Sequence, residues 1–461
     1  MTKCTGSEDA TLDFGRLGRR RIEADFSGGD LSSDGGLLLL RQTDQIIGLT
    51  QAAAAALCDV RDGSRVEHSL HTLMRQRVFA LCAGYEDLND HQRLREDTLM
   101  QTAVGRNRAL GSAPTLCRFE NAATSADCAR LSAVLVEQFL AAHDRAPESI
   151  TLDVDASDVP LHGDQEGSQF HGYYDHYCYL PLYVFCGNHL LASYLRKSRI
   201  DGAKNVTALI KVLVARIRQL WPSTRIIIRG DSGFCRQRLL RFCEANAIFY
   251  LIGVARNARL ERAVAADEAR LQAAFKATAL KQRECVEMRY AADSWQSERR
   301  VVARLEYGEK GNNPRYVVTN LGIDEFDANA LYETLYCGRG EAENRIKEVQ
   351  LDLFGTRASC QRFVANQFRL LLAALSYTLM QAFKRLALSG SEMARASTET
   401  IRSRLMKIGA SVVANTRRIR VALCSAHPMQ QLFIEASRRL WALLAGALVR
   451  RASNDALRGV P

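Results

Sequence analysis

Residues 225–234 read RIIIRGDSGF, a run of three isoleucines that leads through Arg229 into a carboxylate at Asp231. The β-branched run predicts a short buried strand. An unpaired carboxylate at a buried strand end costs several kcal/mol, so we expect Asp231 to have a partner. That partner could be a metal ion, another cation or water. Alternatively, Asp231 caps the following helix or pairs with Arg229 or Arg236.

The segments around this strand predict an α/β layout. Alternating residues predict a strand before it, and a second short apolar run predicts one after it. In chain order we expect a strand at 150–156, a hairpin within 173–197 that turns at Gly187–Asn188, a helix at 204–220, the strand above, a helix at 236–247 and a strand at 249–255.

The rest of the chain divides by composition and pattern. We predict a mainly helical region over residues 1–145, a β-rich insertion over 256–316, a mainly helical stretch over 325–387 and a basic helical region over 391–461. The helical region at 1–145 could read DNA ends, although its acidic balance gives that idea no electrostatic support.

The net charge is +11, and positive charge concentrates near the C-terminus. Residues 381–461 hold 14 Lys and Arg against 4 Asp and Glu, whereas residues 1–150 hold 17 against 21. A basic tract that includes Arg417, Arg418 and Arg420 suits a polyanion, because neutralising phosphates releases counterions. A solvated, arginine-rich helix face is the alternative.

Composition points to a soluble protein of 461 residues with a large core, since 47% of residues are hydrophobic and 25% are charged. We find no apolar run near the roughly 20 residues that span a bilayer, and the start lacks the apolar core of a signal peptide. We therefore expect a cytoplasmic location and no membrane partner. The 13 cysteines include no Cys-x-x-Cys pair, which favours reduced thiols over a zinc ribbon.

Acidic residues fall at three informative places. Asp153 and Asp155 lie two apart on the first strand, so both project from the same face. Asp231 ends the central strand, and Glu343 lies in a predicted helix. Three carboxylates that converge in this way suit phosphoryl transfer with two magnesium or manganese ions, which prefer oxygen ligands.

The helix around Glu343 carries a spaced set of polar side chains. Intervals of three and four residues place them on one helix face. The set comprises Tyr336, Arg339, Glu343, Lys347 and Gln350.

These residues resemble a family signature. Tyr336-x2-Arg339-x3-Glu343 is similar to the Tyr-x2-Arg-x3-Glu-x6-Lys motif of DDE-type bacterial insertion-sequence transposases. Asp231-Ser232-Gly233-Phe234 resembles the second-aspartate motif of that group, and Asp155-Ala156-Ser157 resembles the first. Residues 152–185 resemble, more narrowly, the insertion-sequence-thirteen-eighty branch. The chain departs from the signature at its last position, where Gln350 replaces lysine and Lys347 is a possible substitute.

The resemblance implies a ribonuclease H-like catalytic core, formed by residues 146–255 and 317–390, with the β-rich insertion between. It implies that Asp155, Asp231 and Glu343 bind two magnesium or manganese ions, with Asp153 as the alternative first aspartate. It also implies double-stranded DNA as partner, both as terminal inverted repeats and as target, and a homodimer or larger complex in the bacterial cytoplasm at the nucleoid. Candidate DNA contacts are Tyr336, Arg339, Lys347, Arg229, Trp295, Arg417, Arg418 and Arg420.

Two other groups of residues have weaker functional interpretations. Trp295 lies at a predicted turn and could stack on an unpaired base, although a packed tryptophan without such a role is the common case. His162, His171 and His176 match no standard zinc spacing, and the glycines among them indicate a turn between strands.

We predict from these features a transposase that cleaves its element's ends and joins them to target DNA. One alternative is an inactivated transposase that acts as a DNA-binding repressor. Another is a ribonuclease H-like nuclease that does not transfer strands.

Overall fold

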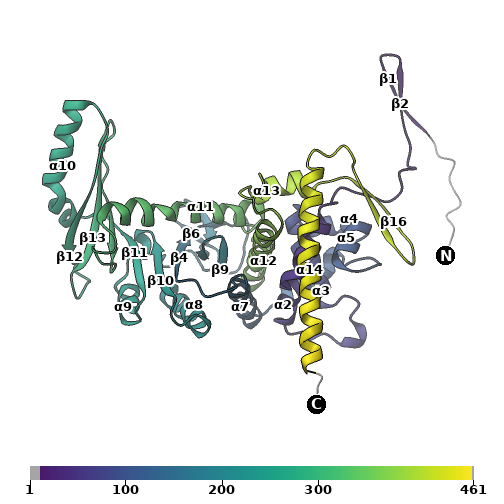
Figure 1. Cartoon of the computed structure of the whole chain (residues 1–461), viewed down its shortest axis with the longest axis horizontal. Coiled ribbons are helices and arrows are strands. Elements are labelled where there is room, and N and C mark those ends of the chain that lie inside the picture. The colour runs from purple at the N-terminus through teal and green to yellow at the C-terminus, as the bar shows by residue number, and fades with distance from the viewer. Residues whose placement is uncertain (1–10, 459–461) are drawn as a thin grey trace. The chain divides into compact units, whose positions relative to one another are not determined.

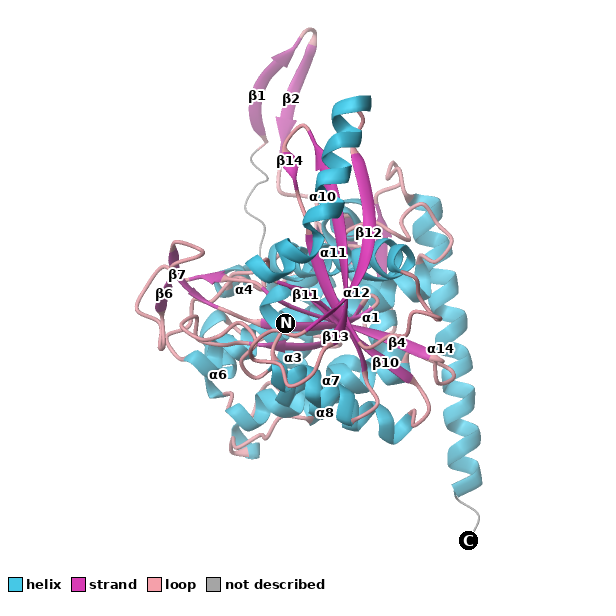
Figure 2. Cartoon of the chain, turned by 90° about the vertical axis from the view of Figure 1, so that its left-hand side faces the viewer, coloured by secondary structure: helices cyan, strands magenta, loops and turns pink. Residues whose placement is uncertain are grey.

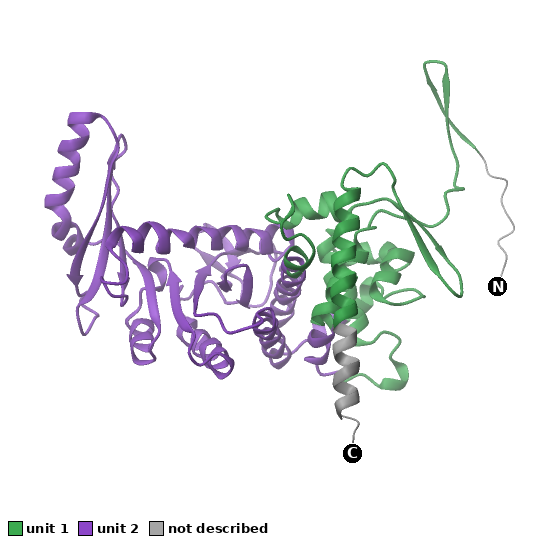
Figure 3. Cartoon of the chain, in the orientation of Figure 1, with its two compact units in different colours: residues 1–50, 60–118, 382–461 green, residues 51–59, 119–381 purple. Residues whose placement is uncertain are grey.

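The computed structural model describes residues 11–458, and the chain divides into two compact units (Figure 3). Unit 1 consists of residues 1–50, 60–118 and 382–461. Unit 2 consists of residues 51–59 and 119–381. Three helices cross the boundaries between these ranges: α2 (Leu49–Ala55), α6 (Ala113–Ala122) and α12 (Phe363–Ala387).

Unit 2 is built around a nine-stranded mixed sheet (Figure 1). Its strands are β4 (Ser149–Ala156), β8 (Leu182–Cys186), β9 (His189–Tyr194), β10 (Arg225–Gly230), β11 (Phe249–Val254), β12 (Gln282–Tyr290), β13 (Arg299–Gly308), β14 (Gly311–Asn312) and β15 (Arg315–Thr319). Their order is β12-β13-β15-β11-β10-β4-β8-β9, and β14 pairs with β13. The central strand β10 runs parallel to β4 and to β11, while the other pairs are antiparallel.

Helices cover both faces of the sheet. Alternate strand residues such as Leu152, Ile228 and Ile252 join one large core with α7 (Ser125–Ala141), α8 (Val206–Leu220), α9 (Gln237–Ala245) and α10 (Ala258–Thr278). On the opposite face, Leu251 and its neighbours pack against Leu331 and Tyr332. This alternation sends Asp153 and Asp155 to the second face, away from α8 and α9.

A continuous helical segment lies on that second face, and Figure 1 shows it crossing the sheet. Its parts are the π-helical turn η4 (Ala330–Tyr336), the 3-10 turn η5 (Cys337–Arg339), α11 (Gly340–Lys347) and the π-helical turn η6 (Glu348–Asp352). A π turn is bonded from residue i to i+5, so it shifts the side-chain register relative to an α-helix. The segment therefore does not present a single regular face.

Residues 256–316, predicted as a β-rich insertion, extend the core sheet. After α10, the strands β12 to β15 return to the core, where β15 pairs antiparallel with β11 from Leu251↔Thr319 to Val254↔Tyr316. The sequence alternation signalled strands but could not show which strand they would pair with.

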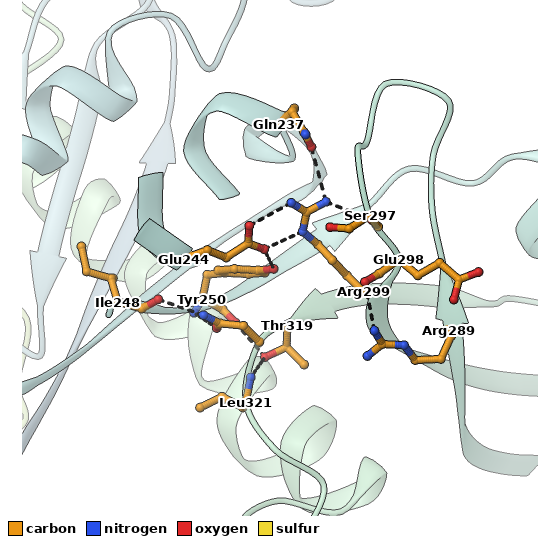
Figure 4. A network of polar contacts seen from close by, with 11 residues as sticks. Gln237, Glu244, Ile248, Tyr250, Arg289, Ser297, Glu298, Arg299, Thr319 and Leu321 are labelled. Atoms are coloured by element: carbon orange, nitrogen blue, oxygen red, sulfur yellow. Dashed lines mark hydrogen bonds and ion pairs between the residues drawn. The ribbon is translucent and has the colours of Figure 1, made fainter. Parts of the chain in front are cut away.

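A polar network fastens these strands to α9 (Figure 4). The Arg299 guanidinium donates to both Glu244 oxygens, at 2.7 and 3.0 Å, and to Gln237 Oε1 at 3.3 Å. The Tyr250 hydroxyl also donates to Glu244, at 2.8 Å. Because Arg299 is buried, this pair is a two-point anchor rather than a solvated surface contact.

A small three-stranded sheet follows β4 and projects from the body in Figure 2. It contains β5 (Val159–Pro160), β6 (Gln169–His171) and β7 (His176–Tyr179), in the order β5-β7-β6. The turn predicted from the glycines among the histidines lies between β6 and β7. The 3-10 turn η3 (Ser232–Phe234) completes the described elements of unit 2.

Unit 1 contains helices and two further sheets. Its helices are α1 (Leu37–Ile47), α3 (Leu70–Ala83), α4 (His91–Leu94), α5 (Thr98–Val104), α13 (Thr398–Ile401) and α14 (Gln430–Arg458), with short turns η1 (Gly63–Arg65), η2 (Leu88–Asp90) and η7 (Arg402–Met406). Its strands are β1 (Leu12–Leu17), β2 (Arg20–Ala24), β3 (Leu31–Ser32), β16 (Ala410–Ala414) and β17 (Ile419–Leu423).

The region 391–461, predicted to be helical, also contains two strands, β16 and β17, which form an antiparallel hairpin. The sequence there, ASVVANTRRIRVAL, alternates β-branched residues around a turn. Asn415 closes that turn, because its side chain accepts bonds from the Arg417 and Arg418 nitrogens.

Among the described residues, one helix is long and apolar enough by length and composition to cross a membrane. This helix is α12, and 78% of its most apolar window is buried inside the protein. A helix that is apolar on all sides and buried in this way is typical of a protein core.

Candidate active site

Asp155 and Asp231 lie at the carboxyl ends of neighbouring parallel strands. The register pairs Arg229 with Asp153 and Gly230 with Val154. Continuing that register by one residue brings Asp231 beside Asp155. Carboxyl ends of parallel strands are where α/β sheets place their functional groups.

Asp155 is a buried carboxylate whose pKa is raised to about 6. Burial is the main cause, and the negative charges of Asp231 and Glu343 raise the pKa further. Arg339 and the Ala156 N–H, which donates to Oδ1 at 2.8 Å, act in the opposite direction. Asp155 is therefore near enough to Asp231 and Glu343 for their charges to affect it.

Asp231 begins the 3-10 turn η3 and caps it. Its Oδ1 accepts a bond of 2.8 Å from the Gly233 N–H. Asp231 therefore caps the turn that follows it, as in the alternative to a metal partner that we considered from the sequence. The basic partners that we considered for it pair elsewhere, Arg229 with Asp153 and Arg236 with Asp201.

Arg339 connects the helix to the strand. Its Nη1 lies 3.3 Å from Asp155 Oδ2, and its Nη2 donates to Glu343 Oε1 at 2.8 Å. Glu343 is half-exposed, whereas Asp155 is buried. One guanidinium thus lies between the first and the third carboxylate.

The alternative first aspartate, Asp153, is engaged in the core. Arg229 donates to both of its oxygens, at 2.5 and 2.9 Å, and both side chains are buried. Gly338 makes room for this pair, because a Cβ there would lie 2.6 Å from Arg229 Nη1. Arg229 is therefore a structural residue in this protein, which corrects its inclusion among the candidate DNA contacts.

Tyr336 is lodged beside the Asp231 turn. A Cβ added at Gly253 on β11 would lie 2.8 Å from the Tyr336 hydroxyl and 2.8 Å from the Ser232 nitrogen. Burial raises the pKa of Tyr336. The positive charge of Arg339 acts to lower this pKa, and the negative charge of Asp231 acts to raise it. Tyr336 therefore belongs to the same cluster as the carboxylates.

Lys347 and Gln350 do not share a face, which corrects the prediction from their spacing. Lys347 is exposed, whereas Gln350 is buried. Gln350 donates to the Asp158 carbonyl at 2.9 Å and accepts from the Ser157 hydroxyl at 3.3 Å. Val349 and Gln350 continue the buried side of the helical segment that Ala342 and Ile346 begin, whereas Lys347 lies on its exposed side.

Trp295 is buried, so the stacking role predicted for it is not supported. Its ring packs edge-on against Tyr290 at 5.6 Å, and the Arg299 guanidinium lies 5.1 Å from its centroid. The alternative of a packed tryptophan is correct. In contrast, Arg417, Arg418 and Arg420 are exposed on the β16–β17 hairpin of unit 1.

Sequence reasoning missed one pair beside the site. His176 Nε2 lies 2.8 Å from Asp158 Oδ2, three residues beyond Asp155. The signal in the sequence was the second aspartate of DASD. Its partner could not be identified, because the contact depends on the pairing of β5 with β7.

The carboxylates fit divalent metal ions by their chemistry, since oxygen ligands suit magnesium and manganese. Within the described residues, however, no group of three or more His, Cys, Asp or Glu side chains is arranged to hold an ion. Arg339 is the cation that lies between Asp155 and Glu343 in this structure. The carboxylate oxygens are therefore suitable ligands, but the Arg339 side chain must move away before an ion can bind between Asp155 and Glu343.

The sequence also matches a known family. Residues 14–445 match the family described as Transposase DDE domain group 1. The chain belongs to the DDE transposase family. This match confirms the resemblance noted from the motifs across nearly the whole chain, while the narrower insertion-sequence-thirteen-eighty branch stays a prediction.

The chain is similar to the cryo-EM structure of the piggyBac transposase synaptic complex with hairpin DNA, with a TM-score of 0.40 and 12% sequence identity. The similarity covers 81% of this chain and 80% of that chain. No curated protein matches the transposase.

Proposed function

We propose that this DNA transposase excises and inserts an insertion-sequence element by metal-dependent hydrolysis and strand transfer at terminal inverted repeats. The observation that carries the proposal is that Asp155 and Asp231 lie at the ends of adjacent parallel strands, and that Arg339 pairs with both Asp155 and Glu343.

In this proposal Asp155, Asp231 and Glu343 hold two magnesium or manganese ions. Such ions, when bound, activate the attacking oxygen and stabilise the leaving oxygen in phosphoryl transfer. The Gly233 N–H orients Asp231, and Arg339 orients Glu343. Tyr336 packs against β11 beside the turn that follows Asp231.

Bound DNA offers Arg339 an alternative partner. Its guanidinium can bind a phosphate through two parallel hydrogen bonds, as it binds carboxylates. A phosphate that takes Arg339 away from Asp155 and Glu343 would leave these carboxylates free for metal. Metal binding and DNA binding would then support each other.

The test uses a plasmid that carries the transposase gene with its flanking DNA, because the element's ends lie there. With magnesium, the wild-type protein should nick this plasmid at discrete sites. Asp231→Asn and Glu343→Gln should bind the same DNA without nicking it. Glu341→Gln is the matched control, since Glu341 lies on the same helix but bonds Arg345, and it should cleave normally.

Three outcomes separate the alternatives. Normal cleavage by Asp231→Asn or Glu343→Gln would overturn the assignment of the site. Cleavage without joining of the released 3′-hydroxyl to a second plasmid would indicate a nuclease. Binding of DNA without cleavage, together with no carboxylate-dependent uptake of manganese, would indicate a repressor.

A further inference from the structure

The β6–β7 hairpin carries an unusual group of aromatic side chains. We call its residues 169–177 the aromatic hairpin. Its rings form two groups. In one, Phe170 and Tyr177 lie 5.7 Å apart, centroid to centroid. In the other, Tyr174 lies 5.0 Å from His171, 5.0 Å from Tyr173 and 6.1 Å from His176.

Three of these rings face solvent, whereas His171, Tyr174 and His176 are partly buried. Tyr173 is 84% exposed, Tyr177 is 55% exposed and Phe170 is 37% exposed. Aromatic side chains usually bury most of their surface, and a contiguous exposed group marks a binding surface. The hairpin turn is closed by the Asp175 N–H, which donates to the His171 carbonyl at 2.9 Å, so Tyr173 is presented at the tip.

The aromatic hairpin is attached directly to the candidate active site. Its strand β7 pairs with β5, which begins four residues after Asp155. His176 of the hairpin contacts Asp158, and the backbone of Asp158 accepts a bond from Gln350 at the end of the Glu343 helix. The side of the hairpin that carries Tyr173, Tyr174 and His176 is therefore the side that adjoins the candidate site.

A shallow cavity of about 540 Å³ lies at the base of the aromatic hairpin. It is lined by Phe170, His171 and Gly172 on one side and by residues 198–201 on the other. Arg199 is exposed there, and its Nε donates to the Phe170 carbonyl at 3.4 Å. The acidic residue of this lining, Asp201, is neutralised by two bonds from Arg236.

We propose that the aromatic hairpin and Arg199 bind an unpaired nucleotide of the DNA end, with its base stacked on Tyr173 or Tyr177. The inference rests on the proposed function and adds to it a single-stranded subsite beside the carboxylates. Exposed rings next to a cation are the combination that binds single strands, because every base has a face that can stack and every nucleotide carries a phosphate.

The test compares two fluorescein-labelled DNAs in EDTA by anisotropy: a blunt duplex, and the same duplex with a short unpaired tail. The wild-type protein should bind the tailed DNA about tenfold more tightly, which is the size of effect that stacking one base produces. Tyr173→Ala together with Tyr177→Ala should abolish this preference and leave blunt-duplex binding unchanged. A 2-aminopurine in the tail should be quenched by the wild-type protein alone.

Two matched variants identify the chemistry. Tyr173→Phe keeps the ring and should keep the preference, whereas Tyr173→Leu keeps the bulk without the ring and should reduce it. Arg199→Gln should weaken binding of the tail and make it less sensitive to salt.

Several results would overturn the inference. One is a preference that survives the double alanine variant, and another is full activity of Tyr173→Leu in tail binding. A change in the sedimentation of the free protein caused by Tyr173→Ala would show that the rings contact a second copy instead. Failure of the inference alone would appear as normal binding and cleavage of duplex without tail preference, whereas failure of the proposed function would abolish cleavage.

Discussion

Arg229 and Asp153 form a two-point ion pair across neighbouring parallel strands, with N···O distances of 2.5 and 2.9 Å. Both side chains are buried, and Gly338 approaches the guanidinium without a Cβ. The pair takes Asp153 out of consideration as a solvent-accessible ligand in this arrangement. It also connects β4, β10 and the Glu343 helix, because Arg229 donates to the Leu335 carbonyl as well.

Removing one member of this pair should destabilise the protein strongly. Asp153→Ala leaves a buried guanidinium without its partner, so we expect a loss of about 3–5 kcal/mol in the free energy of unfolding. Combining it with Arg229→Met should recover much of that loss, because no buried charge remains. Urea titrations measure both values. An exposed role for Asp153 would instead predict little change for the single variant.

Asp155 should make stability depend on pH in the absence of metal. Its pKa is about 6 in the folded protein and 3.8 in the reference state, so between these values the folded protein retains a proton that the unfolded chain has lost. The contribution of Asp155 to the free energy of unfolding is therefore fully present below pH 3.8 and is lost as the pH rises through about 6. Relative to Asp155→Asn, the wild-type protein should lose roughly 2–3 kcal/mol between acidic and neutral pH. Urea titrations in EDTA measure the difference in unfolding free energy between the wild-type protein and Asp155→Asn. A difference that does not change with pH would contradict the prediction.

Arg339→Ala should strengthen metal binding by the free protein. The substitution removes a positive charge that contacts Asp155 and Glu343, so we expect manganese affinity to rise by about fivefold to tenfold, or ~1 kcal/mol. DNA cleavage should fall at the same time, because Arg339 would no longer orient Glu343. Calorimetry measures the first effect.

Arg345→Ala is the control for this experiment. Arg345 pairs with Glu341 on the same helix at 2.7 Å, with the same four-residue spacing as Arg339 and Glu343. Its removal should leave manganese affinity unchanged. Equal effects of the two variants would show that Arg339 has no special relation to the carboxylates.

Gly253→Ala should impair cleavage more than folding. The added methyl would press on the Ser232 nitrogen and the Tyr336 hydroxyl, which must move to relieve contacts of 2.8 Å. A displacement of catalytic groups by about 1 Å can cost on the order of 100-fold in rate. Cleavage assays at matched DNA occupancy measure the effect. Gly322→Ala has open space around its Cβ and should behave like the wild-type protein.

The β16–β17 hairpin should contribute electrostatically to DNA binding. Replacing Arg417, Arg418 and Arg420 by alanine removes exposed charges, so folding should be unaffected. The slope of log affinity against log salt should fall by about 0.9 for each phosphate that the protein no longer neutralises. Lys276→Ala, on the exposed side of α10, is a control. An unchanged slope in the triple variant would mean that the hairpin does not bind DNA.

Local patterns predicted the central strands well. The run RIIIRG forms β10 over Arg225–Gly230, the alternation at 150–156 corresponds to β4, and the turn at Gly187–Asn188 lies between β8 and β9. Each of these segments carries its own signal, since period, β-branched residues and turn residues agree within a few positions.

Contacts between distant residues could not be predicted. The sequence could not show that Arg229 pairs with Asp153, because their approach depends on the parallel register of β10 and β4. The spacing of three residues suggested that Gln350 lies beside Lys347, but Gln350 belongs to the buried side of the segment and Lys347 to the exposed side. The prediction for Trp295 failed for a similar reason, since the turn that contains it folds back onto Tyr290.

Because β15 pairs with β11, the positions of Asp231 and Glu343 do not depend on the length of the segment between them. The chain returns to the sheet in a register fixed next to Gly253. Residues added at the exposed turn Glu309–Lys310, between β13 and β14, would therefore not displace either acid. The same turn is a suitable place to fuse a fluorescent reporter that follows the protein through a transposition reaction.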